Sequence, residues 1–507
     1  MSALVLLNPK DDVATLTKAA KAGETLVEGG AALAKDVPPG HKIAAKAIAE
    51  GAPIRKFGQI IGYAQAAIAA GEHVHTHNCH VGQHDQDYQV GVDLAAAQQA
   101  IPSGAAKTFM GFKRSNGQVG TRNFIALCST VNCSATVVRQ AAHEITMSGV
   151  LEEFPNVDGV CVFAHGTGCG MAMSNEGAAN LQNVLWGHAV HPNVGAAIFV
   201  GLGCEVMQIE VMKTVYGEVH ADRFHELTIQ ETGGTRATID RLKDMVLERL
   251  PEVNAIEREE CPASALTVAL QCGGSDGYSG ITANPALGVA VDKLVGQGGT
   301  GMLAETPEIY GAEQLLLRRA ASPAVADKLI ERIKWWEGYT ASHGASMDNN
   351  PTPGNKAGGL TTILEKSLGA ASKGGSTPLA DVVGYGEQVK SKGFVFMDSP
   401  GYDPVSVTGQ IAGGAQIVVF TTGRGSAFGS KPAPTIKLAT NDMLFHAMPD
   451  DMDINCGDVL SAGVSLEAKG EEILDEILAV ASGKPSKSEA LGLGDSEFVP
   501  WQVGVVM

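Results

Sequence analysis

Apolar and polar positions divide the chain into four stretches. Across residues 1–90 the apolar residues form short alternating runs broken by Gly and Pro, a pattern that predicts a small β module. Residues 91–108 are polar and rich in Ala and Gln, and they predict a linker. Beyond them apolar runs alternate with helical spacing. We therefore expect an α/β fold, with a middle domain at 109–255 and a C-terminal domain at 256–507.

The two α/β stretches contain apolar runs short enough for buried strands, separated by segments with helical periodicity. In the middle stretch each of these runs closes on Gly, Cys or His. The predicted strands are 125–131, 157–164, 196–202, 266–271, 393–397, 417–421 and 435–438. The predicted helices are 235–250, 326–336 and 471–481.

Composition narrows the possible partners. The 507 residues include 37 Lys and Arg against 55 Asp and Glu, a formal charge of -18, which argues against a nucleic-acid-binding surface. A small anionic substrate is still compatible, because it needs only a local cluster of Arg and Lys. We expect a soluble, cytoplasmic protein without membrane contact, since no 18-residue apolar span or export signal is present. The nine cysteines then predict reduced thiols, some of which could bind metal.

Chemically active side chains follow many of the predicted strands. In open α/β sheets ligands bind beyond the carboxyl ends of the strands, so these positions are candidates for a site. Thiolates and imidazole suit iron or zinc, although the spacing lacks a CxxC pair. For any single cysteine a small buried hydrophobe is the alternative. The residues concerned are Cys133, His165, Cys169, Cys204, Glu205, Cys272, Asp276, Glu305 and Arg424.

A run of histidines, HVHTHNCH, lies near the end of the β module. Alternate residues of a strand point to one side, so His73, His75 and His77 could share a face and bind a divalent ion. The alternative is a solvated polar strand face.

Three glycine-rich segments could hold an anion. Residues 273–288 combine glycines with Ser, Asp, Thr and Asn ahead of a helix start, more small polar groups than a plain turn requires. Lys356 lies between glycines, where an ammonium could act as a base or bind a carboxylate; a surface lysine is the alternative. Arg424, in TTGRG, could bind a carboxylate through two hydrogen bonds. None of these segments has the order of a nucleotide P-loop or a GxGxxG fingerprint.

Several long motifs together resemble the altronate and galactarate dehydratase family: QCGGSDGYSGITANPALG, PTPGNKAGGLTTILEKSLG, FTTGRG, GLGCE and GQVGTRN. HVHTHN, ETPEIYGAEQLL and GNKAGG look closer to the altronate enzymes. The resemblance implies an N-terminal SAF, or β-clip, module, a middle α/β domain used in a homodimer, and a C-terminal Rossmann-like parallel sheet flanked by helices. It also implies an iron-dependent loss of water from a sugar acid to give a 2-keto-3-deoxy acid.

The implied reaction assigns roles to the candidate residues. Removal of the proton next to a carboxylate creates an anionic enediolate, which needs positive charge, a base and an acid. We expect Lys356 as the base with His165 next in order, Arg424 as the carboxylate ligand, and Fe²⁺ as the cofactor. The expected substrate contacts are Ser275, Thr282, Asn284, Asn355, Thr422, His75 and His77.

The metal could lie at either of two places. The preferred neighbourhood is Cys272, Asp276 and Glu305, and the competing one is Cys133, Cys169 and Cys204 with His165. An iron–sulfur cluster on the four cysteines that follow predicted strands is a further hypothesis, which we place after a single iron ion.

Altronate is the first choice of substrate, and galactarate or another aldarate or aldonate is the alternative. A non-catalytic sugar-acid-binding protein would not need several hundred residues of motif-rich sheet, and a dinucleotide oxidoreductase would need the missing glycine fingerprint.

Overall fold

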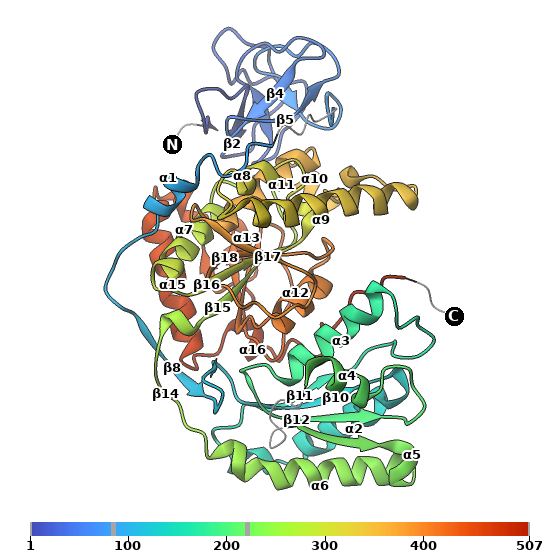
Figure 1. The fold of residues 1–507 in the computed structure, drawn as a ribbon. Helices are drawn as coiled ribbons and strands as arrows, with labels where there is room; N and C mark the ends of the chain where they lie inside the picture. The colour runs from blue at the N-terminus through green and yellow to red at the C-terminus, as the bar shows by residue number, and fades with distance from the viewer. Residues whose placement is uncertain (1–2, 83–87, 218–223, 505–507) are drawn as a thin grey trace.

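The computed structural model describes residues 3–82, 88–217 and 224–504. A strand-rich N-terminal module lies at one end, on the helices of a central C-terminal domain, and the middle domain lies at the other end (Figure 1). The expected mixed α/β fold is confirmed. The predicted module of residues 1–90 includes 1–2 and 83–87, which lie outside the described residues.

The N-terminal module consists of two small antiparallel sheets. Buried aliphatic residues such as Ile43, Ile54 and Ile61 fill its interior. The first sheet has the order β1 (Leu4–Val5), β2 (Val13–Leu16), β3 (Lys42–Ala44), β6 (His73–Val74). The second has the order β4 (Pro53–Lys56), β5 (Gln59–Ala64), β7 (Cys79–His80).

The middle domain is a four-stranded parallel sheet in the order β11-β10-β12-β13. Every residue of β10 and β12 is buried, which is why these strands read as continuous apolar runs. The strands are β10 (Phe124–Ser129), β11 (Gly159–Phe163), β12 (Val194–Gly201) and β13 (Phe224–Thr228). The helices are α2 (Asn132–Met147), α3 (Glu176–Ala189), α4 (Ile209–Tyr216), α5 (Ile229–Thr232) and α6 (Thr235–Asn254).

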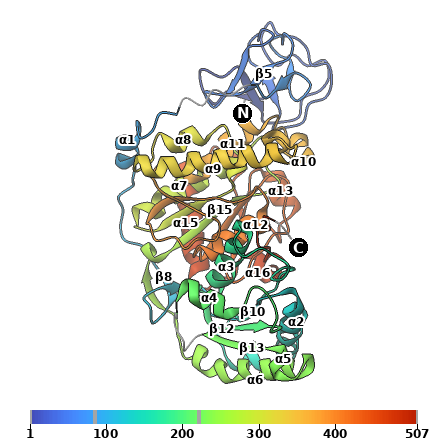
Figure 2. The same cartoon turned by 45° about the vertical axis from the view of Figure 1, so that its right-hand side comes forward.

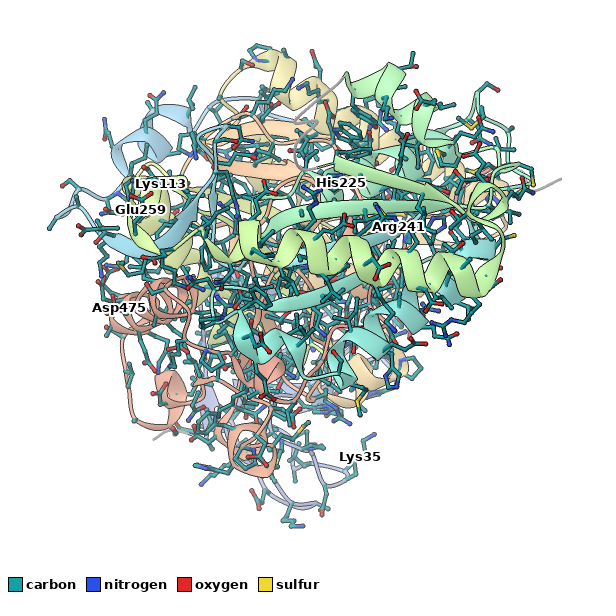
Figure 3. The ribbon with its side chains drawn as sticks, turned by 90° about the horizontal axis from the view of Figure 1, so that it is seen from below. Lys35, Lys113, His225, Arg241, Glu259 and Asp475 are labelled. Carbon is teal, nitrogen blue, oxygen red and sulfur yellow. The ribbon has the colours of Figure 1, made fainter. Side chains whose placement is uncertain are left out.

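A short antiparallel sheet joins the middle and C-terminal domains. It is formed by β14 (Glu259–Pro262), β8 (Thr108–Lys113) and β9 (Val119–Gly120). Lys113 and Glu259 lie side by side on it (Figure 3) and form an ion pair of 3.0 Å. Part of the preceding stretch, expected as linker, forms helix α1 (Leu94–Gln99).

The C-terminal domain is a seven-stranded parallel sheet in the order β17-β18-β16-β15-β19-β20-β21. From the central β15 the chain first builds the β16 side and then crosses to β19, so the direction of strand addition reverses between β15 and β19. Ligands bind at such a reversal in open α/β sheets. The strands are β15 (Thr267–Cys272), β16 (Thr300–Leu303), β17 (Leu379–Val383), β18 (Gly393–Met397), β19 (Ile417–Thr422), β20 (Thr435–Ala439) and β21 (Ile454–Asn455).

Ten α-helices among the described residues surround this sheet. The long helix α9 crosses the end of the domain beneath the N-terminal module (Figure 2). They are α7 (Ala283–Gly296), α8 (Glu313–Leu317), α9 (Pro323–Ser342), α10 (Pro353–Ala357), α11 (Ile363–Ala371), α12 (Asp403–Ala412), α13 (Asp442–Ala447), α14 (Asp458–Ser461), α15 (Leu466–Ala481) and α16 (Lys487–Ala490). In the described parts of the chain, no helix combines the length and the apolar character needed to cross a bilayer.

Candidate active site

Three ionisable side chains converge at the carboxyl ends of β15 and β16. Cys272 ends β15, and Glu305 and Glu308 follow β16. One ligand atom from each lies within 4.8 Å of the other two, and all three residues are buried. The thiol of Cys272 lies 3.5 Å from a carboxylate oxygen of Glu308. This is the arrangement in which one metal ion could be bound by sulfur and carboxylate oxygen.

Two buried lysines flank the three candidate ligands. Lys373 Nζ donates to Cys272 Sγ at 2.9 Å, and Lys366 Nζ donates to Glu308 at 2.6 Å. Burial raises the pKa of the Cys272 thiol to about 11, against the opposing effect of the Lys373 ammonium. Burial would also raise the pKa of Glu308, but the ammonium groups of Lys366 and Lys373 outweigh it and hold this pKa below its ordinary value.

Glu305 is the least satisfied group of the three. Neither of its carboxylate oxygens has a hydrogen-bond partner among the described residues, although the residue is fully buried. Its backbone is strained as well, at a φ of 74° that side chains other than Gly rarely adopt. Burial and the nearby Glu308 raise its pKa well above the ordinary value. A cation would compensate this carboxylate, so the residues present fit a metal ion.

Asp403 adds a proton-carrying group beside these residues. It is the first residue of α12, and a Cβ at Gly273 would lie 2.3 Å from its carboxylate. Glycine therefore gives the carboxylate room to approach the end of β15. Burial, together with the negative charge of Glu308, raises the pKa of Asp403 to about 7. A carboxyl group with this pKa can donate or accept a proton at neutral pH.

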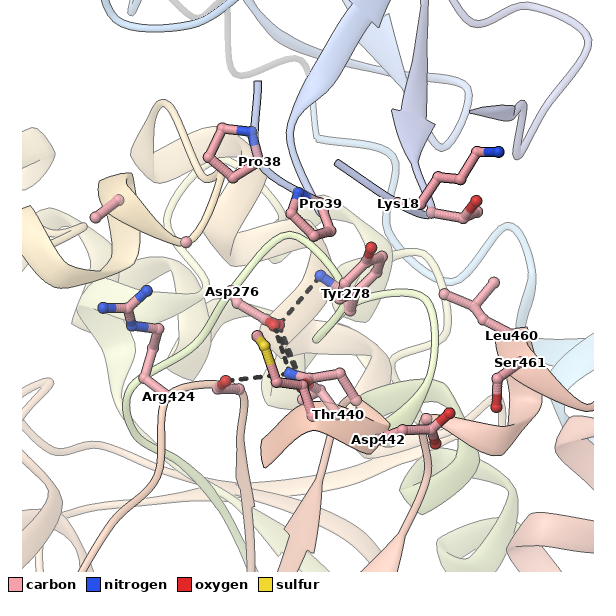
Figure 4. Close-up of a pocket in the computed structure, with 17 residues that line it drawn as sticks. Lys18, Pro38, Pro39, Asp276, Tyr278, Arg424, Thr440, Asp442, Leu460 and Ser461 are labelled. Atoms are coloured by element: carbon pink, nitrogen blue, oxygen red, sulfur yellow. Dashed lines mark hydrogen bonds between the residues drawn. The ribbon is translucent and has the colours of Figure 1, made fainter. Parts of the chain in front are cut away.

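A cavity of about 500 Å³ lies between the N-terminal module and the C-terminal domain (Figure 4), and one loop leads to it from the Cys272 group (Cys272, Glu305 and Glu308). The loop from Cys272 to Asp276 connects the two, because Asp276 lines the cavity. The guanidinium of Arg424 lines it too and has no hydrogen-bond or ion-pair partner among the described residues. Further lining residues are Thr17, Lys18, Pro38, Pro39, Tyr278 and Thr440.

Asp276 does not join the candidate metal ligands, contrary to the preferred neighbourhood from the sequence. Its buried carboxylate accepts hydrogen bonds from Ser279 Oγ at 3.0 Å and from Thr440 Oγ1 at 3.0 and 3.1 Å. Asn441 and the backbone N–H groups of Tyr278 and Ser279 donate to it as well. These donors occupy the acceptor positions that a metal would use, so Asp276 holds the loop in shape, and Glu308 takes the third ligand position.

Most of the expected substrate contacts hold loops together. Asn284 accepts from Thr421 at 2.6 Å and donates to the Gly369 carbonyl, and Thr282 donates to the Thr440 carbonyl at 2.8 Å. Asn355 caps α10 and donates to the carbonyl of Ser275 at 2.9 Å. The hydroxyl of Thr422 accepts the N–H of Gly425, which shapes the turn that carries Arg424. These residues position the cavity wall.

The histidine run contacts the helix that carries Lys356. Strand β6 ends at Val74, so His75 and His77 lie in a turn and not on the expected strand face. The rings still gather, since the centroids of His73 and His75 lie 5.4 Å apart and those of His73 and His77 lie 5.5 Å apart. His75 Nε2 lies 2.9 Å from the Lys356 carbonyl. Lys356 itself is partly exposed, next to the cavity residues Ala357 and Gly358.

His41, which the sequence did not single out, completes this group. Its Nδ1 lies 3.1 Å from His73 Nε2. Burial, reinforced by the other imidazoles, lowers the pKa of His73 to about 3, and burial lowers that of His75 to about 4. These rings are neutral at pH 7 and form an uncharged wall beside α10.

A buried ion triad holds the N-terminal module on the C-terminal domain. Lys42 Nζ and Lys56 Nζ lie 2.8 and 2.9 Å from the two carboxylate oxygens of Glu365, and all three side chains are at most 1% exposed. Burial would raise the pKa of Glu365, but the two ammonium groups hold it far below its ordinary value. Glu365 lies in the motif PTPGNKAGGLTTILEKSLG, but its role was not predicted, because the two lysines that pair with it come from a distant part of the sequence.

We expect Lys42→Met to loosen the N-terminal module. The substitution leaves part of a buried charge without its partner, which costs about 3–5 kcal/mol. The free energy of unfolding, measured in urea, should fall by that amount, and limited proteolysis should cut the module more quickly. Lys46→Met is the matched control, because Lys46 is an exposed lysine paired with Asp12 and should contribute at most about 1 kcal/mol. Equal losses in both variants would contradict this assignment.

The competing metal set lies in another sheet. Cys133, Cys169 and Cys204 follow β10, β11 and β12 of the middle domain, whereas Cys272 ends β15 of the C-terminal sheet, so the four cysteines do not form one cluster. Both ring nitrogens of the buried His165 are engaged, by Thr167 Oγ1 at 2.9 Å and the Ser129 carbonyl at 3.0 Å. Burial lowers the pKa of His165 to about 4. Its environment leaves it neither a metal ligand nor a base facing the cavity.

Comparison with known proteins covers nearly the whole chain. Residues 2–82 match the altronate/galactarate dehydratase SAF domain, 111–254 the second domain of D-galactarate dehydratase/altronate hydrolase, and 263–506 the D-galactarate/altronate dehydratase C-terminal domain. An altronate dehydratase of Bacillus subtilis is 36% identical over 96% of both chains, and one of Escherichia coli is 37% identical over 90% of both. A galactarate dehydratase (L-threo-forming) of E. coli is 34% identical over 92% of this chain and 89% of its own.

Proposed function

Because the chain belongs to the D-galactarate/altronate dehydratase family, and the altronate and galactarate dehydratases among its relatives are hydro-lyases, we propose that it removes water from altronate or a closely similar sugar acid. In this reaction a base takes the proton from C2 and the 3-hydroxyl leaves as water with a second proton. The resulting enol tautomerises to a 2-keto-3-deoxy acid. The observation that carries the proposal is the buried carboxylate of Glu305, which has no hydrogen-bond partner among the described residues. It belongs to the Cys272 group, whose loop leads to a cavity lined by Arg424.

Cys272, Glu305 and Glu308 would hold a ferrous ion. When bound, the ion would supply positive charge where the enediolate develops. Their donor set of one sulfur and two carboxylates suits Fe²⁺, and the two buried lysines balance part of its negative charge.

The remaining roles fall to one cavity residue, Arg424, and to two residues near the cavity or the Cys272 group. Arg424 binds the substrate carboxylate with its planar guanidinium, and Lys356 removes the C2 proton. Asp403 in its protonated form donates a proton to the departing hydroxyl, which its pKa of about 7 permits. The N-terminal module supplies one wall of the cavity with Pro38 and Pro39, which reduces the access of water.

An aldarate such as galactarate is the second candidate substrate. It carries a carboxylate at each end and therefore needs a second cation. Lys18, from the N-terminal module, lines the cavity on the side away from Arg424 (Figure 4). This pair of cations could bind both carboxylates of one substrate.

A panel of aldonic and aldaric acids, assayed anaerobically with Fe²⁺ and without nicotinamide, tests the proposal. Formation of a 2-keto acid from altronate faster than from galactarate is the expected result. Turnover of aldarates alone would select the second candidate. Binding of these acids without turnover would instead indicate a sugar-acid-binding protein.

Arg424→Ala is expected to raise KM and lower kcat/KM by the equivalent of roughly 2–4 kcal/mol, since a charge pair with the carboxylate is lost in both ground and transition states. Steady-state kinetics on the preferred acid measures this. Arg424→Lys keeps the charge but cannot form the bidentate hydrogen bonds of the guanidinium, so it should restore only part of the lost kcat/KM. An unchanged KM in Arg424→Ala would place the carboxylate elsewhere.

The role of Asp403 as the proton donor predicts that kcat/KM depends on pH. Asp403 must be protonated to donate, so kcat/KM should fall as pH rises through about 7. Asp403→Asn should remove this ionisation from the profile and lower kcat by about 10²-fold. The exposed Asp450, changed to Asn, serves as the control and should leave the profile unchanged. A descending limb that persists in Asp403→Asn would assign the ionisation to another group.

A further inference from the structure

Three of the nine cysteines differ from the rest in their exposure. Cys79, Cys128, Cys161, Cys261, Cys272 and Cys456 are buried, as cysteines usually are. Cys133, Cys169 and Cys204 are exposed, and all three belong to the middle domain. Packing does not account for these three thiols.

The three exposed cysteines lie beyond the same edge of one sheet. Cys133 is the second residue of α2, directly after β10, while Cys169 follows β11 and Cys204 follows β12. Strands β11 and β12 each pair in parallel with β10. The carboxyl ends of the three strands therefore meet at one edge, which is where ligands bind in such sheets.

Hydrogen bonds tie the three cysteine-bearing loops to one another. The N–H of Asn132 donates to the Thr167 carbonyl at 2.9 Å, which joins the loops of Cys133 and Cys169. The N–H of Met207 donates to the Gly168 carbonyl at 3.0 Å, which joins those of Cys169 and Cys204. Thr130 Oγ1 donates to Glu205 at 2.7 Å, which joins the loops of Cys133 and Cys204.

The loops are also held closely together by their own residues. A Cβ at Gly168 would lie 2.2 Å from the Thr130 carbonyl oxygen, and the φ of this residue is 94°, so only glycine allows the approach. The buried Glu205 accepts the N–H of Gly203 at 2.7 Å, and His165 is engaged at both ring nitrogens. The side chains of Thr130, His165 and Glu205 are thus used internally, whereas the three thiols are exposed.

The spacing of the thiols argues against a single ion. A tetrahedral metal with metal–sulfur distances of about 2.3 Å requires sulfurs about 3.8 Å apart. Among the described residues, the group of three ligands within 4.8 Å of one another is the Cys272 group, and the three exposed sulfurs do not form such a group. A polynuclear cluster, in which each thiolate binds a different iron, accommodates a wider spacing.

We propose that Cys133, Cys169 and Cys204 bind an iron–sulfur cluster of the [4Fe–4S] type. Three irons take one thiolate each, and the fourth keeps an open coordination position. Cys133 lies in the first turn of the 16-residue helix α2, where the positive end of the helix dipole favours an anionic cluster. This site goes beyond the proposed function, and its test does not depend on dehydratase activity.

Anaerobic reconstitution of the full-length protein with ferric iron, dithiothreitol and sulfide tests the proposal. After desalting we expect about four acid-labile sulfides per chain and the broad visible absorption of a thiolate-bound cluster. Sulfide and absorption are the deciding readouts, because the Cys272 group could bind one iron without sulfide. Cys133→Ala, Cys169→Ala and Cys204→Ala should each lose most of both signals.

Cys161→Ala is the matched control, since Cys161 is a buried cysteine of β11 in the same sheet, and it should keep the cluster. The proposal is overturned if the reconstituted protein contains no sulfide, or if the triple variant retains the absorption. Recovery of two of the three cysteines as a disulfide after the same anaerobic treatment would also overturn it.

Discussion

Glu305→Gln is expected to lower kcat by about 10³-fold and to abolish tight iron binding at the Cys272 group. The neutral amide removes the one buried carboxylate of this group that has no partner among the described residues, and a bound metal contributes several kcal/mol to charge stabilisation. Steady-state kinetics with anaerobic Fe²⁺ and the iron content after desalting without sulfide measure the two effects.

Glu313→Gln provides the control for this variant. Glu313 is an equally buried glutamate eight positions further on, which accepts a hydrogen bond of 2.8 Å from Tyr88. A glutamine there keeps an acceptor, so activity should remain close to that of the wild type. Full activity of a chelated wild-type protein, with the absence of metal verified by elemental analysis, would contradict the role of the metal.

Lys356→Ala is expected to lower kcat by about 10²-fold or more while substrate binding stays measurable, because a base acts mainly on the chemical step. The substitution leaves the contact between His75 and α10 intact, since that contact uses the Lys356 carbonyl. Exchange of the C2 proton with deuterated solvent, followed by NMR, is the direct measurement. Lys356→Arg, which keeps the charge but is too basic to accept a proton, should also fail to exchange.

Exchange at the wild-type rate in Lys356→Ala would place the base elsewhere. His165 is then a poor choice, because both of its ring nitrogens are engaged in the middle domain. Asp403 would take its place as the next candidate.

Seven strands of the two parallel sheets were predicted because most of them are long apolar runs buried on both faces, whereas β13, β16, β17 and β21 were not predicted. Strands such as β12 and β19 consist of uninterrupted apolar or β-branched residues, and their ends are marked by Gly, Cys or Thr. Cys272 and Glu305 could be nominated for the same reason, since each closes or follows a buried strand. The reaction was predicted from the family resemblance, because the periodicity of apolar residues carries no information about chemistry.

The roles of the remaining site residues could not be predicted from local sequence, although Glu308 lies in the motif ETPEIYGAEQLL. Glu308 comes close to Cys272 only because a tight turn at Glu305 bends the chain, and Lys373 approaches from a different helix. Asp276 looked like a ligand, but besides its local donors it accepts hydrogen bonds from Thr440 and Asn441, more than 160 residues away. In the histidine group the ring of His41 comes from β2–β3 and not from the run itself. Such contacts follow from the tertiary fold.

The ion triad between the module and the C-terminal domain also has a consequence for synthesis of the chain. Glu365 follows Lys42 by 323 residues and Lys56 by 309. At about 5–20 residues per second, the carboxylate is made roughly 15–60 s after the two lysines. During that interval both ammonium groups lack their carboxylate partner. A nascent chain that stops before Glu365 therefore carries a module with no surface on which to dock, and the cavity is complete only after its last lining residue, Ser461, has been made.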